Sequence, residues 1–105
     1  MSTIPFHSLV EKVLEAGSKF PNRWDLKTHY IDLVEEVGEL GNAVLIETKS
    51  KSSKRQRAKL QDSFADVLFQ LISMADEANV DLEASLLQML GELTDRQQQG
   101  EYGNE

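Results

Sequence analysis

Carboxylates recur at helical spacing between residues 31 and 45, in the stretch IDLVEEVGELGNAVL, which contains Asp32, Glu35, Glu36 and Glu39. Glu36 and Glu39 are three residues apart, so on a helix they are neighbours and their like charges repel. No Lys or Arg lies between Asp32 and Glu47 to offset this charge. We therefore expect a divalent cation, Mg²⁺ or Mn²⁺, because these ions prefer carboxylate oxygens as ligands.

A second acidic pair lies on the next helical stretch. Residues 64–75, FADVLFQLISMA, contain only three polar side chains, those of Asp66, Gln70 and Ser73. A helix that is apolar nearly all round is usually buried, and a buried carboxylate without a partner is costly. We therefore expect Asp66, with Asp62 one turn earlier, to face the first acids across a shared metal ion. The alternative is a solvated acidic surface, because acidic helix faces are common.

Periodicity and capping signals predict four helices and no strand. The predicted helices run from about Pro5 or Phe6 to Ala16, from an Asp25 cap to about Thr48, from between Ser53 and Leu60 to about Ala78, and from Leu82 to Gln98 after an Asp81 cap. The expected fold is an all-α four-helix bundle formed by a single domain over residues 1–105.

Apolar residues on these helices predict the packed faces. Those expected to point inward are Leu33, Val37, Leu40 and Val44 on the second helix, and Leu82, Leu86, Leu87, Leu90 and Leu93 on the fourth. On the third helix, Phe64, Leu68, Phe69 and Ile72 point in too many directions for four short helices to cover. We therefore expect a homodimer or a homotetramer, arranged as a dimer of dimers.

The composition restricts the function classes. The chain has no cysteine, which excludes disulfides, thiolate nucleophiles and Cys-bound zinc, and favours a cytoplasmic location. Its net charge of −7 argues against nucleic-acid binding. Residues 1–9 lack the features of a signal peptide, and no stretch has the roughly 20 apolar residues of a membrane span, so no membrane partner is expected.

The acidic motifs resemble those of a known superfamily. Glu35-Glu36-Val37-Gly38-Glu39-Leu40 is similar to the E-E-x-x-E signature of the MazG-like all-α nucleoside triphosphate pyrophosphohydrolases. Residues 62–68, DSFADVL, occupy the place of that superfamily's second motif, E-x-x-D, and the resemblance covers about residues 24–96. It implies a MazG-like bundle that cleaves (deoxy)nucleoside triphosphates into monophosphate and pyrophosphate, in house-cleaning or nucleotide-pool control.

The resemblance also implies roles for individual residues. Glu36, Glu39 and Asp66 would be Mg²⁺ ligands, and Glu35 would orient water or ligand, so these four form the expected catalytic set. The chain departs from the superfamily at Ser63, where a Glu is usual. Asp62 is a candidate fourth metal ligand in its place, although it leaves the helix about 100° away from the Ser63 direction.

Substrate contacts are expected from residues on either side of the acids. Trp24 lies where similar proteins place an aromatic that stacks on the base, and the alternative is a core tryptophan that closes the end of the bundle. His29 lies two turns before Glu36 on the same side of the helix, where it either contacts base or sugar or is a surface residue.

The basic residues gather in the segment 49–59, KSKSSKRQRAK, predicted to be a loop at its start. Lys54, Arg55 and Arg57 are candidates for holding the phosphates, as is Arg96 on the fourth helix. The alternative is a solvated linker whose charge offsets the acids. Residues 99–105 are expected to form a loose tail.

Two other functions remain open at this stage. One is a catalytically weak helical bundle, impaired at Ser63, that binds nucleotide or a protein partner. The other is a purely structural acidic bundle, whose stability would not respond to metal ions.

Overall fold

The computed structural model describes residues 3–49 and 53–100. The chain forms four helices, and the described residues contain no strand. The helices are α1 (Phe6–Ser18), α2 (Leu26–Lys49), α3 (Lys54–Glu77) and α4 (Leu82–Gln98). The predicted all-α class and the four helices are therefore confirmed.

Local capping explains where the helices begin. The side chain of Asp25 accepts a hydrogen bond from the Thr28 N–H at 2.8 Å, and Asp81 accepts one from the Ala84 N–H at 3.0 Å. Both caps were predicted from sequence, and they satisfy backbone donors that the first helical turn leaves free. Asn79 connects α3 to α4 with a left-handed backbone, φ 58°, a conformation that asparagine tolerates better than most residues.

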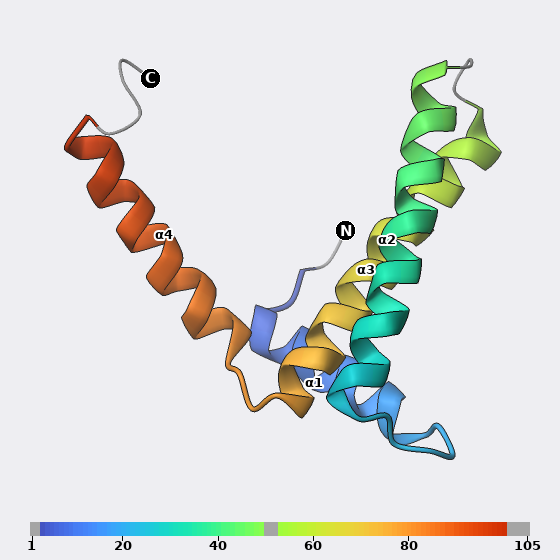
Figure 1. The fold of residues 1–105 in the computed structure, drawn as a ribbon, viewed down its shortest axis with the longest axis horizontal. Coiled ribbons are helices and arrows are strands. Elements are labelled where there is room, and N and C mark those ends of the chain that lie inside the picture. The colour runs from blue at the N-terminus through green and yellow to red at the C-terminus, as the bar shows by residue number, and fades with distance from the viewer. Residues whose placement is uncertain (1–2, 50–52, 101–105) are drawn as a thin grey trace.

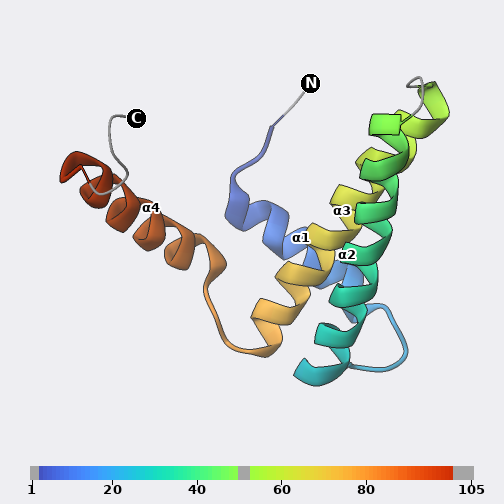
Figure 2. The ribbon, with the colours of Figure 1, turned by 45° about the horizontal axis from the view of Figure 1, so that its top comes forward.

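The main packing is between α2 and α3, which lie side by side and run in opposite directions, while α1 packs more narrowly against α3 (Figures 1 and 2). The face of α2 toward α3 includes Glu36, Leu40 and Ala43, of which Ala43 is buried. Val37 and Val44 are 49% and 40% exposed, so their predicted inward position is wrong for the single chain. The contact face is rotated toward the acids, and it therefore places Glu36 between the two helices.

The fourth helix stands apart from the others in both views (Figures 1 and 2). It makes no contact comparable to that between α2 and α3. Leu86, Leu87 and Leu90 are 51%, 64% and 44% exposed, so their predicted burial within a bundle is wrong for the single chain. The sequence pattern did identify the apolar face of α4, but this chain's own helices do not cover it.

The chain is consequently more open than a globular domain of its length. Its radius of gyration is 17.1 Å, whereas a compact chain of this size has about 13 Å. Ala43 and Ile72 are the only buried apolar side chains in the described part of the chain. On α3, Phe64 is 57% exposed and Leu68 is 42% exposed.

No helix within residues 3–49 and 53–100 combines the length and the apolar character needed to cross a bilayer.

Candidate functional site

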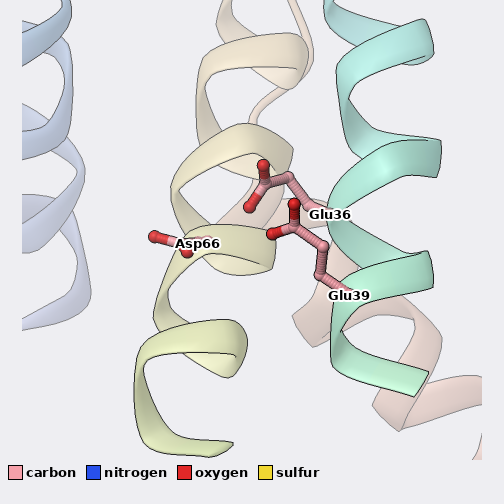
Figure 3. Close-up of side chains that lie close together, drawn as sticks. All are labelled: Glu36, Glu39 and Asp66. Atoms are coloured by element: carbon pink, nitrogen blue, oxygen red, sulfur yellow. The ribbon is translucent and has the colours of Figure 1, made fainter. Parts of the chain in front are cut away.

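Three carboxylates converge between α2 and α3. One oxygen from each of Glu36, Glu39 and Asp66 lies within 4.8 Å of the other two. Figure 3 shows Glu36 and Glu39 extending from α2 toward α3, the helix that carries Asp66. We call these three residues the acid triad. The sequence predicted that these acids would meet across the two helices, and the structure brings them together.

The antiparallel pairing of α2 and α3 positions the acid triad. Glu36 and Glu39 are almost one turn apart, so they project from the same side of α2. Glu36 is half-buried, whereas Glu39 and Asp66 are exposed. Asp66 is exposed, so the prediction that it would be a buried carboxylate is wrong for the single chain. Glu36 is the acid that lies in the helix interface.

The electrostatics of the acid triad single out Glu36. Burial raises the pKa of the Glu36 carboxyl above its ordinary value, and the charges of Glu39, Asp32, Asp66 and Glu35 raise it further. Both effects disfavour the ionised form. Within residues 3–49 and 53–100, the charges that shift the pKa of Glu36 are all negative, and a divalent ion would relieve this repulsion.

The geometry of the acid triad fits a hard cation. Mg²⁺ binds oxygens at 2.0–2.1 Å, so two oxygens on opposite sides of the ion lie about 4.2 Å apart. At most one pair among three ligands can be opposite, and the other pairs are adjacent, about 2.9 Å apart. The carboxylate oxygens, which lie within 4.8 Å of one another, would therefore have to move closer by rotation of the exposed Glu39 and Asp66 side chains. Three carboxylates supply half of an octahedral shell, and water or phosphate oxygens would complete it.

The remaining acids of the two motifs lie outside the acid triad. Glu35 and Asp62 are exposed, and neither belongs to the set of close carboxylates in the described residues. Ser63, at the position where a Glu is usual, is half-buried on α3. The role of Asp62 as a fourth ligand therefore stays a prediction.

A cavity of about 830 Å³ adjoins the acid triad, and Glu36 and Asp66 form part of its lining. Trp24 and His29 also line it, and their ring centroids lie 5.7 Å apart with the rings tilted by 59°. Trp24 is 42% exposed, so it does not close a core within this chain. Both residues thus lie on the same cavity as the acids, as the sequence spacing of His29 and Glu36 had indicated.

A hydrogen-bond chain centred on the buried Gln70 forms part of the wall of this cavity. Gln70 is buried on α3, where its side-chain N–H₂ donates to Asp32 on α2 and its carbonyl oxygen is bonded to the Nδ1 atom of His29. All three residues line the cavity. From the sequence, Asp32 was recognised only as one of the acids of the stretch 31–45, and Gln70 had no predicted role at the site. The available signal was Gln70 itself, a polar residue in the most apolar stretch of the chain.

An ion pair fixes the loop that carries Trp24. The Nε and Nη2 atoms of Arg23 donate to the same carboxylate oxygen of Glu77, at 2.9 and 2.7 Å. Arg23 lies directly before Trp24, and Glu77 is the last residue of α3, so the pair ties the α1–α2 loop to the end of α3. Arg23 and Glu77 are 54 residues apart, and no local pattern predicts their pairing.

The predicted phosphate-binding cations are not in the cavity lining. Lys54, Arg55 and Arg57 lie in the first turn of α3, about 14–18 Å along the helix from Asp66. Arg57 on α3 donates a hydrogen bond to Glu47 on α2 at 3.1 Å, so its guanidinium already forms an ion pair between the two helices. Arg96 lies in the last turn of α4, away from the α2–α3 pair (Figure 1). The predicted tail, residues 99–105, lies largely outside the described residues, since only 99 and 100 are described.

Comparison with known proteins adds no family assignment to this geometry. The chain matches no protein-family model and no curated protein. The functional argument therefore rests on the acid triad, the adjoining cavity and the two sequence motifs.

Proposed function

We propose that this protein is a Mg²⁺-dependent nucleoside triphosphate pyrophosphohydrolase of the MazG-like kind. The observation that carries the proposal is the convergence of three carboxylate oxygens, each within 4.8 Å of the others, beside a cavity of about 830 Å³. Ligand cavities for small molecules measure roughly 300–1,000 Å³, so this one has room for a nucleotide. The two acidic motifs, on consecutive helices in the expected order, support the same assignment.

In this proposal the residues of the acid triad would hold Mg²⁺ (or Mn²⁺). The bound ion would neutralise phosphate oxygens and make water a better nucleophile. Glu36 contributes the half-buried ligand, and Glu39 and Asp66 contribute ligands from the more open side. Glu35, exposed beside Glu36 on α2, would orient water or ligand. Trp24 and His29, which line the same cavity, would contact the nucleoside.

The basic residues take part only through movement or through another subunit in this proposal. Lys54, Arg55, Arg57 and Arg96 do not line the cavity of the single chain. A second copy of the chain could bring one of them to the phosphates.

Self-association is part of the proposal, and the exposed surface supports it. The chain exposes 8419 Å², about 2,500 Å² more than is typical for a compact monomer of 11.8 kDa. A standard protein–protein interface covers about 800 Å² of each partner, so the excess is enough for one large interface or several smaller ones. Exposed apolar side chains on α3 and α4, such as Phe64 and Leu87, are the surfaces that a second copy would cover.

Pyrophosphate release from a panel of deoxynucleoside and ribonucleoside triphosphates, with Mg²⁺ and with EDTA, tests the catalytic proposal. We expect Mg²⁺-dependent release, and we expect Glu39→Gln to reduce kcat by at least about 100-fold because a metal ligand is lost. Asp95→Asn, which removes one carboxylate from the distant helix α4, is the matched control and should retain wild-type turnover.

The outcomes of this assay separate the proposed enzyme from the alternative function. If Glu39→Gln turns over at the wild-type rate, the assignment of these acids to catalysis is wrong. If nucleotides bind without any release of pyrophosphate, the chain is the catalytically weak nucleotide-binding bundle.

A further inference from the structure

The hydrogen-bond chain in the cavity wall has a defined polarity. The ionised Asp32 carboxylate can only accept hydrogen bonds, so the Gln70 amide must turn its N–H₂ group toward Asp32. Its carbonyl oxygen then faces the Nδ1 atom of His29, which must carry a hydrogen to form the observed contact. In neutral His29 the other ring nitrogen, Nε2, is consequently an acceptor.

This polarity determines what the wall offers to a ligand. The second carboxylate oxygen of Asp32 and the Nε2 atom of neutral His29 are both acceptors. Gln70 is only 6% exposed and is held from both sides, so its amide cannot turn over without placing its oxygen against the Asp32 carboxylate. The cation on the cavity lining, Arg23, is bonded to Glu77 and its side chain is 79% exposed. The region around Gln70 therefore favours a ligand that donates hydrogen bonds.

The position of this wall relative to the acid triad matches the length of a nucleoside. Asp32 lies one turn of α2 before Glu36, about 6 Å along the helix axis, and His29 lies about 10 Å before it. Phosphates held at the acid triad would place the sugar next to Glu36 and the base beside Asp32 and His29. Trp24, in contact with the His29 ring, offers an aromatic face on which the base can stack.

From these observations we propose that Asp32, positioned by Gln70, selects nucleotides whose base carries an exocyclic amino group over their keto counterparts. This inference rests on the proposed function for the placement of the phosphates. The amino group of cytosine or adenine donates to the Asp32 oxygen and to His29. The keto oxygen of uracil or hypoxanthine at the same point faces acceptors instead, and polar groups left without a partner in a partly buried site weaken binding.

Two pairs of nearly isosteric ligands test this selection. Binding of dCMP and dUMP, and of dAMP and dIMP, is measured by calorimetry in the presence of Mg²⁺. We expect dCMP and dAMP to bind roughly 10-fold or more tightly than their keto partners. The same order is expected for kcat/KM with dCTP and dUTP. Asp32→Asn presents an N–H₂ group in place of an oxygen, and it should bring the dCMP to dUMP affinity ratio close to 1 or invert it.

Control variants distinguish recognition from a general effect on folding. Asp95→Asn removes the same charge elsewhere and should leave the ratio unchanged. The Gln70→Met variant keeps a similar side-chain volume but cannot form hydrogen bonds with Asp32 or His29. It should lower the ratio of dCMP affinity to dUMP affinity more strongly than it lowers kcat. If Asp32→Asn folds poorly, the ratio in Gln70→Met is the deciding measurement.

The inference and the proposed function can fail separately. Turnover of all nucleotides with equal kcat/KM, or a wild-type affinity ratio in Asp32→Asn, would overturn the base selection and leave the hydrolase intact. Absence of turnover with a preserved preference for dCMP over dUMP would overturn the hydrolase and support the selection. Absence of binding by all four monophosphates would overturn the base site itself.

Discussion

Replacement of Glu36 by Gln should stabilise the metal-free protein. Gln keeps the shape of the side chain and removes the charge that burial and four neighbouring acids disfavour. Two of those neighbours, Glu39 and Asp66, have oxygens within 4.8 Å of an oxygen of Glu36. Because Glu39 and Asp66 are exposed, water screens their charges, and the repulsion of Glu36 by each of them amounts to about 1 kcal/mol. Removal of both repulsions should raise the free energy of unfolding by about 2 kcal/mol at low ionic strength.

The corresponding shift in melting temperature is large enough to measure. In a domain of about 100 residues, 1 kcal/mol changes Tm by about 4–8 °C. We therefore expect Glu36→Gln to melt about 8–16 °C above the wild type at pH 8, in EDTA and at a fixed protein concentration. High salt should reduce the difference, because exposed charges are screened. Glu35→Gln removes the same charge next to the acid triad and should shift Tm less.

The pH dependence of this difference has a defined sign. Because the pKa of Glu36 is raised in the folded state, the folded protein holds a proton over a pH range in which the unfolded chain has released it. The free energy of unfolding therefore falls as the pH rises from the ordinary Glu value through the raised pKa of Glu36. The stability advantage of Glu36→Gln should grow over the same range.

Magnesium should reverse the order of stability. Wild-type protein should gain about 2.7 kcal/mol when the ion is present at 100 times its Kd, whereas Glu36→Gln should gain much less. Scanning calorimetry or thermal circular dichroism measures both effects. A Glu36→Gln protein that melts below the wild type in EDTA, or that keeps the full Mg²⁺ stabilisation, would refute the electrostatic reasoning for the acid triad.

Two further predictions concern folding and assembly. The Asp25→Ala variant loses the hydrogen bond from the Thr28 N–H, and chemical denaturation should show a free energy of unfolding about 1 kcal/mol below that of the wild type. The Asp25→Asn variant keeps a capping oxygen and should retain most of the wild-type stability. Equal loss in both variants would contradict the cap assignment. The Leu90→Glu variant places a charge on the exposed apolar face of α4, and analytical ultracentrifugation should show a shift toward monomer. The control is Lys12→Glu, at an exposed position on α1. An unchanged mass for Leu90→Glu would exclude this face of α4 from the interface.

Local sequence signals predicted the elements of the fold well. The Asp25 and Asp81 caps, both predicted, lie at the starts of α2 and α4. Each of these signals acts within a few residues, so it can be recognised without knowledge of the tertiary structure. The spacing of Glu36 and Glu39 likewise predicted that they share a helix face.

Interactions between helices were less predictable. The apolar periodicity of α2 pointed to Val37 and Val44, but the contact face is rotated toward Ala43 and Glu36. A helix with apolar residues on several sides has no unique inward direction, and only the partner helix decides between them. The bonds of Gln70 to His29 and Asp32 span 41 and 38 residues, and no local pattern encodes such a distance.

The detached position of α4 has a thermodynamic consequence. A chain whose described part buries only two apolar side chains obtains little intrinsic stability from its own core. If partner chains supply the missing burial, mass action couples folding to association, and dilution alone acts as a denaturant. The midpoint of unfolding would then rise with the logarithm of protein concentration, and the cellular abundance of the chain would help to set the fraction that is folded.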